Sequence, residues 1–257
     1  MEHQLGLALS GGGVKGAAHI GVLKALQEYK INPTCISGTS AGAIVGSFYA
    51  AGCEPEEILD IFRNSSLFSL SHFAFGKPGI IDLDKFADYF KKYLDVDDFS
   101  SLDKELFIVA TDLVNGKMKV FNSGSLIAAM LSSSAFPVVF SPYKEGGNIY
   151  VDGGIVNNFP VELLAERCKY LLGVYLSPLK KITAANLTKS WEVLERAYSV
   201  ANRYSSLQKL DSCNWVIHPQ ELERYDTFDM NKTDEIFELG YQSAKMKMPV
   251  ILKDLGM

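Results

Sequence analysis

One serine of this 257-residue chain stands in a setting typical of a catalytic nucleophile. Ser40 is the centre of Gly38-Thr39-Ser40-Ala41-Gly42, directly after a short apolar run and before a segment of small, helix-forming residues. Glycines two positions away on each side, Gly38 and Gly42, permit the tight strand-to-helix turn that presents such a serine. The sequence therefore predicts that the Ser40 hydroxyl attacks a carbonyl carbon.

A second glycine-rich string, Gly11-Gly12-Gly13-Val14-Lys15-Gly16, follows the apolar run 5–10 and opens a predicted helix. Successive backbone amides at a helix N-terminus can hold the oxyanion of an acyl intermediate. The same string fits a nucleotide-binding loop or a plain structural turn. A dinucleotide site, however, requires an acidic residue after the second strand, and Ile36-Ser37-Gly38 provides none. We favour the oxyanion interpretation, and Lys15 either adds positive charge there or points into solvent.

A nucleophilic serine requires a base, and the chain offers two kinds of candidate. Histidine is the usual partner, and His218 has the late position expected of a hydrolase histidine, although a structural role is favoured for it. Asp152 is the alternative, because it ends a predicted strand and precedes Gly153-Gly154. Its carboxylate would then emerge at the same sheet edge as Ser40 and accept the proton directly. From the residues alone, Asp152 could equally belong to an ordinary Asp-Gly turn.

Three segments taken together resemble the patatin-like phospholipase family: Gly11-Gly12-Gly13-Val14-Lys15-Gly16, Gly38-Thr39-Ser40-Ala41-Gly42 and Asp152-Gly153-Gly154. The block Ser133-Ser134-Ala135-Phe136-Pro137, with Phe140 and Pro142, is similar to the family's block ahead of the aspartate. Order and spacing agree over about residues 5–177, and nothing diagnostic follows beyond about residue 180.

This resemblance implies a Ser–Asp dyad, with Ser40 as nucleophile, Asp152 as base and no catalytic histidine. It also implies an oxyanion hole from the backbone of Gly11–Gly13 and lipid acyl hydrolase activity without a metal or cofactor. Lys15 stands where many members have arginine. Lysine keeps the positive charge but lacks the planar fork of a guanidinium group. The implied substrate is a lipid or another acyl ester. The alternative is an acyl- or lipid-binding protein with a decayed site, which the intact serine, aspartate and glycine loop disfavour.

Composition limits the other classes of function. With 47% hydrophobic residues the chain is expected to be globular, and a net charge of −5 without a basic cluster argues against a nucleic-acid partner. The four cysteines are scattered, without metal-ligand spacing, so no metal site is predicted and reduced thiols are expected. No secretory signal is recognised at the N-terminus, so we expect a cytoplasmic protein that contacts a membrane only peripherally. No oligomeric state is predicted.

Apolar strands alternate with helices along the chain, which predicts an α/β fold of three layers: a central, mostly parallel sheet with helices on both faces. Without an internal repeat or linker, residues 1–257 are predicted to form a single domain. Its motifs lie at about 5–177, and the remainder contributes C-terminal helices and one strand. The predicted strands are 5–10, 34–37, 106–111, 150–151, 170–176 and 215–217, and the predicted helices include 14–29, 41–51, 55–62, 189–210 and 232–248.

Three further segments carry local predictions. The apolar stretch 67–81 could be a lid or an interfacial surface, although packed core is favoured. Phe86, Tyr89, Phe90 and Tyr93 share one stripe of a predicted helix and are expected in the core. The segment 114–118, which contains Asn115-Gly116, is predicted to be a hairpin with a type I′ turn.

Overall fold

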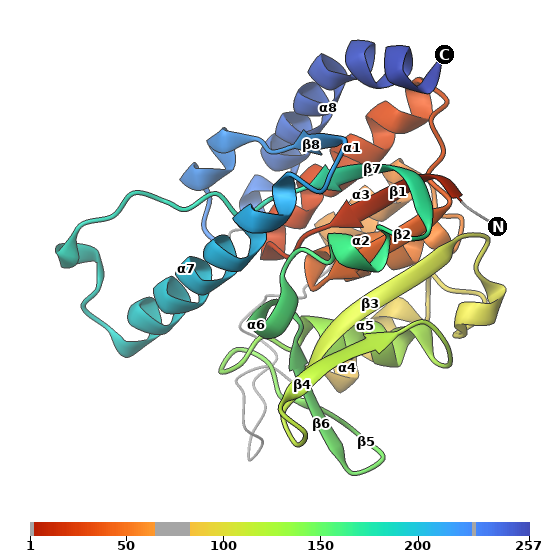
Figure 1. Cartoon of the computed structure of the whole chain (residues 1–257). Helices are drawn as coiled ribbons and strands as arrows, with labels where there is room; N and C mark the ends of the chain where they lie inside the picture. Colours follow the sequence, from red (N-terminus) through yellow and green to blue (C-terminus); the bar gives the residue numbers. More distant parts are fainter. Residues whose placement is uncertain (1–2, 65–82, 228–229) are drawn as a thin grey trace.

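In the computed structural model, which describes residues 3–64, 83–227 and 230–257, eight strands form one sheet with helices on both faces (Figure 1). The strands are β1 (His3–Leu9), β2 (Cys35–Thr39), β3 (Glu105–Asp112), β4 (Lys117–Phe121), β5 (Tyr143–Glu145), β6 (Asn148–Asp152), β7 (Cys168–Val174) and β8 (Trp215–Ile217). The helices are α1 (Ala17–Glu28), α2 (Ala41–Ala50), α3 (Pro55–Asn64), α4 (Asp84–Phe90), α5 (Leu126–Ser134), α6 (Gly154–Asn157), α7 (Ser190–Leu210) and α8 (Thr233–Leu255). A short 3₁₀ helix, η1 (Gly13–Gly16), directly precedes α1.

The strand order is β5-β6-β3-β2-β1-β7-β8, with β4 also paired to β3. The adjacent strands β3, β2, β1, β7 and β8 run parallel to one another. The strands β4, β5 and β6 pair antiparallel with their neighbours. The predicted α/β fold with a layered sheet is confirmed, and the antiparallel strands gather at its β3 end.

The central strands are buried on both faces, which explains their nearly continuous apolar sequences. Successive side chains of a strand point to opposite faces. Leu7 and Leu9 of β1 belong to a large cluster completed by residues of α1, α2, α5 and α8. Ala8, which lies between them, belongs to a smaller cluster on the other face, with Phe159 and Val161. The sheet is thus the middle layer of three.

Strand β3 brings the ends of β2 and β6 together. β2 runs parallel to the first part of β3, and its last residue, Thr39, lies opposite Val109. β4 pairs with the opposite edge of β3. The antiparallel β6 therefore pairs with β3 on the same edge as β2, just beyond the point where β2 ends, and its last residue, Asp152, lies opposite Ala110. Ser40, which follows β2, therefore meets Asp152 across a separation of 112 positions in the sequence.

The aromatic stripe is only partly as predicted. Phe86 and Phe90 of α4 are buried and Tyr89 is partly buried, but α4 ends at Phe90 and the side chain of Tyr93 is 39% exposed. The Tyr93 ring still makes an edge contact with Phe48, 6.4 Å between centroids. The core prediction for Tyr93 is wrong because the helix stops one turn too early to turn this side chain inward.

The hairpin between β3 and β4 is confirmed, but its predicted type I′ turn is wrong. A type I′ turn needs a positive φ at both central residues, and only Gly116 of the Asn-Gly pair has one, at 60°. The Asp112 carboxylate accepts hydrogen bonds from the backbone amides of Val114 and Asn115, both at 3.0 Å. These bonds stabilise a longer connection.

The stretch 67–81, for which a lid or a core role was predicted, lies outside the described residues. Within the described ranges, no helix combines the length and the apolar character that crossing a bilayer requires.

Candidate active site

Ser40 occupies the turn between β2 and α2 in a strained backbone conformation. Its φ of 53° and ψ of −120° lie where non-glycine residues are uncommon. Such strain is characteristic of nucleophile elbows, where it lifts the serine side chain out of the sheet. The predicted strand–turn–helix setting of Ser40 is therefore present.

The Ser40 hydroxyl donates a hydrogen bond of 2.6 Å to Oδ2 of Asp152. The other carboxylate oxygen, Oδ1, accepts from the Gly154 amide at 2.7 Å and from the Tyr198 hydroxyl at 3.0 Å. Asp152 is only 1% exposed, so these donors replace the water that would otherwise solvate it. The two residues of the predicted dyad are in direct contact.

Burial raises the pKa of Asp152 to about 6, although the hydrogen bonds from Ser40, Gly154 and Tyr198 oppose the shift. Desolvation disfavours the charged carboxylate, whereas donors aimed at it favour that form. A carboxylate with a pKa near 4 is a weak base, and a value closer to neutral pH suits proton transfer from a serine better. The environment thus strengthens Asp152 as a base.

Ser133, at the end of α5, supports both dyad residues, and the sequence did not single it out as a site residue. Its hydroxyl accepts from the Ser40 amide at 2.8 Å and donates to the Val109 carbonyl at 2.6 Å. Its carbonyl accepts from the Gly153 amide at 3.2 Å, while the Asp152 amide donates to Ala135 at 3.0 Å. The block ahead of the aspartate therefore fixes the backbone on both sides of the dyad.

Tyr198 of α7 is the second functional candidate that sequence reasoning missed. It reaches the site from beyond residue 180, where no motif was recognised. Its ring packs edge-on against Phe136, 4.8 Å between centroids. A lone tyrosine in a helix carries no local signal for such a contact.

The glycine loop lies beside Ser40, but its three amides are not equivalent. The Gly11 amide donates to the Asn158 carbonyl at 3.0 Å and is therefore occupied. For the amides of Gly12 and Gly13, the described part of the chain provides no hydrogen-bond partner. Gly12 and Gly13 line a pocket together with Ser40 and Asp152. These two amides remain as candidate oxyanion donors.

The other motif glycines permit close approach of neighbouring atoms. Gly13 has a φ of 59°, and a Cβ there would also overlap the Thr227 carbonyl. A Cβ on Gly153 would overlap the Val109 carbonyl, at the point where β6 leaves β3. An added Cβ would also come within 3.0 Å of another heavy atom at Gly11, Gly16, Gly38, Gly42 and Gly154.

Lys15 of η1 lines the same polar pocket as Ser40 and Asp152. Burial lowers the pKa of its ammonium group to about 8, although the negative charges of Asp226 and Glu195 act to raise it. Of the two placements left open by the sequence, a position at the site is the one observed.

Two pockets with different linings meet at the dyad. Ser40 and Asp152 line both of them. One is mostly apolar and is lined by Ile44, Phe62, Phe86, Phe90, Leu131 and Phe140. The other is more polar and includes Lys15, Asn158, Ser177, Glu195, Tyr198 and Asn202. A molecule with an apolar chain on one side and a polar group on the other would fit this pair.

Neither histidine with a described side chain contacts Ser40. His218 donates from Nδ1 to the Tyr175 carbonyl at 2.7 Å, and burial lowers its pKa. His19 is fully buried, shares a 2.7 Å hydrogen bond with the Ser10 carbonyl, and has its pKa lowered by burial to about 4. Both side chains support the backbone, which agrees with the structural role favoured for His218.

Over the described ranges, no group of three or more His, Cys, Asp or Glu side chains is placed to hold a metal ion. The four cysteines form no disulfide.

Comparison with known proteins places the chain in a family. The sequence pattern of the family described as patatin-like phospholipase matches residues 7–165, so the chain belongs to this family. A patatin-like phospholipase domain-containing protein of Caenorhabditis elegans is 29% identical, with 94% of this chain and 20% of that protein covered. A lysophospholipase of Kluyveromyces lactis is 25% identical, with 92% of this chain and 18% of that protein covered. The chain thus spans about a fifth of the length of these relatives.

The fold is also shared with solved structures. Human GIVD cytosolic phospholipase A2, in complex with methyl γ-linolenyl fluorophosphonate, superposes with a TM-score of 0.55 at 14% identity. The match covers 98% of this chain and 58% of that one. At this identity the likeness concerns the fold, which is patatin-like.

Proposed function

We propose that this chain is a serine acyl hydrolase that cleaves carboxylic esters of lipids through a Ser40–Asp152 dyad. The observation that carries the proposal is the 2.6 Å hydrogen bond from Ser40 Oγ to Asp152 Oδ2, at the junction of an apolar and a polar pocket. Membership of the patatin-like phospholipase family and the names of the relatives support the same class of substrate.

In the proposed mechanism, Ser40 Oγ attacks the ester carbonyl while its proton passes to Asp152 Oδ2. The negative oxygen of the tetrahedral intermediate accepts hydrogen bonds from the Gly12 and Gly13 amides, and Lys15 adds positive potential nearby. The intermediate collapses, and the leaving alcohol takes the proton from Asp152. Asp152 Oδ2 then accepts a proton from a water molecule that attacks the acyl-enzyme. As the second tetrahedral intermediate collapses, this proton returns to Ser40 Oγ and the fatty acid is released.

The proposal is tested by incubating the purified chain with phosphatidylcholine, lysophosphatidylcholine and triacylglycerol and measuring released fatty acid by mass spectrometry. We expect release from at least one of these lipids, unaffected by a metal chelator. Binding of lipid without release would instead favour the acyl-binding alternative.

The apolar pocket is proposed to hold the acyl chain. Ile44 of α2 lines this pocket and is 6% exposed. We expect Ile44→Trp to fill the pocket and to reduce kcat/KM for long-chain p-nitrophenyl esters by at least about tenfold, while acetate and butyrate esters keep most of their rate. The matched control is Val250→Trp, at a position on α8 that is 53% exposed. An equal loss at every chain length would contradict this assignment of the pocket.

A further inference from the structure

Tyr198 lies outside the segment that matches the family, yet its hydroxyl touches the dyad. We propose that Tyr198 is a positioning residue, which keeps the Asp152 carboxylate ionised and turned with Oδ2 toward Ser40. The inference rests on the proposed function, in which Asp152 is the base.

The first support is the way the hydrogen bonds divide between the two carboxylate oxygens. Oδ1 accepts from both the Tyr198 hydroxyl, at 3.0 Å, and the Gly154 amide, at 2.7 Å. Oδ2 accepts from Ser40 at 2.6 Å. Two donors on Oδ1 hold the carboxylate plane, and Oδ2 is left as the oxygen that receives the serine proton.

The second support is electrostatic. Burial drives the pKa of Asp152 upward, and the Tyr198 hydrogen bond is one of three that oppose this. Besides Asp152, the charged side chains that line the polar pocket are Lys15 and Glu195. The rise in the pKa of Asp152 is nevertheless opposed by hydrogen bonds and not by these charges. Burial and the charge of Asp152 also raise the pKa of Tyr198 well above its usual value. Tyr198 therefore stays protonated and remains a donor through neutral and mildly alkaline pH.

The third support is the fit between Tyr198 and the motif that follows Asp152. A Cβ on Gly154 would overlap the Tyr198 hydroxyl. Gly154 thus opens the space through which the hydroxyl reaches Oδ1. On the other side, the Phe136 ring packs against the Tyr198 ring, and the buried Asn202, one turn along α7, interacts with the hydroxyl. Tyr198 is held in place from both sides.

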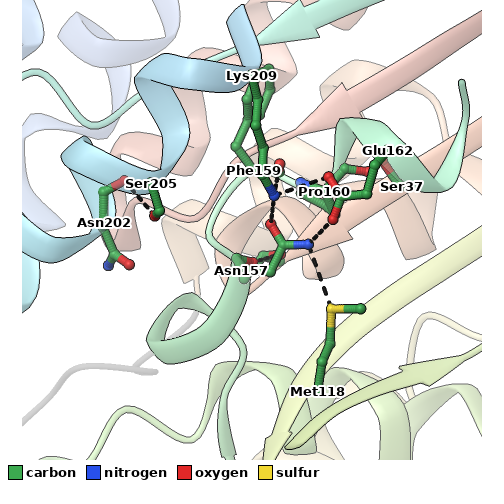
Figure 2. Close-up of polar contacts among 10 residues, drawn as sticks. Ser37, Met118, Asn157, Phe159, Pro160, Glu162, Asn202, Ser205 and Lys209 are labelled. Carbon is green, nitrogen blue, oxygen red and sulfur yellow. Dashed lines mark hydrogen bonds and ion pairs between the residues drawn. The ribbon is translucent and has the colours of Figure 1, made fainter. Parts of the chain in front are cut away.

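A cluster near the C-terminal end of α7 anchors the helix that carries Tyr198 (Figure 2). Lys209 Nζ donates to Asn157 Oδ1 at 2.6 Å, to the Phe159 carbonyl at 3.3 Å and to Glu162 Oε2 at 2.9 Å. The Asn157 side-chain amide also contacts Glu162 and the sulfur of Met118, as Figure 2 shows. The Lys209 contacts tie α7 to α6 and the segment after it, so α7 is fixed relative to the backbone that follows Asp152.

The test is the pH dependence of kcat/KM for a soluble fatty ester in Tyr198→Phe, which removes only the hydroxyl. Loss of a donor to the ionised form raises the pKa of Asp152, so the acid limb should move to higher pH by about one unit. At pH 6 the rate should fall by about fivefold, while at pH 8.5 it should stay within about twofold of the wild type. The control is Tyr204→Phe, at a position on the same helix that is 74% exposed, and its profile should be unchanged.

A second substitution, which keeps the hydroxyl, should shift the acid limb in the opposite direction. 3-Fluorotyrosine at position 198 is a stronger hydrogen-bond donor, so the acid limb should move to lower pH. Melting temperatures of both variants serve as a check on folding. An acid limb that stays at the wild-type pH in both variants, whether or not the rate falls, would overturn the claim that Tyr198 keeps Asp152 ionised.

Failure of this inference can be separated from failure of the proposed function. The pKa of Asp152 is measured directly by ¹³C NMR of protein labelled at aspartate Cγ, with Asp152→Asn used for assignment. If the wild type hydrolyses no ester, the proposed function fails, but the NMR titration of Tyr198→Phe still tests the contact. If the wild type is active and the Asp152 titration is the same in both proteins, the inference about Tyr198 is wrong.

Discussion

Substitution of Ser40 by alanine should lower kcat/KM for a chromogenic fatty ester by about 10⁴-fold or more, because the attacking atom is removed. The fold should be retained, since Ser40 holds its position through its backbone amide, which donates to Ser133, and not through its side chain alone. Turnover of p-nitrophenyl butyrate, with circular dichroism to check the fold, provides the measurement.

The matched control for this substitution is Ser212→Ala, at an exposed serine in the turn after α7. It should retain the wild-type rate. Activity of the Ser40 variant above about one-hundredth of the wild-type value would mean that another group performs the attack, and the proposed mechanism would have to be abandoned.

Substitution of Asp152 by asparagine should lower kcat/KM by about 10³-fold. The amide keeps the size of the side chain and can still accept a hydrogen bond from Ser40, but it cannot take the serine proton. Asp211→Asn, at an exposed carboxylate at the end of α7, is the matched control and should have no effect. A rate for Asp152→Asn within about tenfold of the wild type would show that the carboxylate is not the base.

If Asp152 is the base, as proposed, it should also set the pH dependence of the wild type. A base must be deprotonated to act, and the pKa of Asp152 is raised to about 6 by burial. Activity should therefore be present above pH 6 and fall as the pH drops through this value. An acid limb near pH 4 would mean that the carboxylate is solvated during catalysis.

The sequence predicted those parts of the site that depend on local conformation. The Ser40 turn requires flanking small residues and a strand–turn–helix setting, and both are visible within a few positions. The alternation of apolar strands with helices likewise predicted the α/β sheet, because strands buried on both faces must be apolar throughout. Such features are encoded by neighbouring residues.

The meeting of Ser40 and Asp152 could be expected from the family resemblance, but the residues alone did not require it. It depends on the register of two strands against β3, with Thr39 opposite Val109 and Asp152 opposite Ala110. Register between strands far apart in sequence is set by packing of the whole sheet. This is why Asp152 remained compatible with an ordinary turn until the strand pairing was known.

Tyr198, Ser133 and the occupied Gly11 amide could not be predicted for a related reason. Each depends on a partner brought close by tertiary packing: Asp152 for Tyr198, the Ser40 amide for Ser133, and the Asn158 carbonyl for Gly11. Tyrosine, serine and glycine are common in all elements, so their presence alone indicates no function. For Ser133, a weak signal was available, since it belongs to the block that the family places ahead of the aspartate.

The most direct measurement is covalent labelling with a fluorophosphonate, followed by peptide mapping, because only an activated serine reacts with this reagent. We expect a single adduct on Ser40 in the wild type, the same adduct in His72→Ala and His218→Ala, and a labelling rate reduced by about 10³-fold in Asp152→Asn. Labelling that is lost in a histidine variant, or that proceeds at the wild-type rate without the Asp152 carboxylate, would contradict the Ser40–Asp152 dyad.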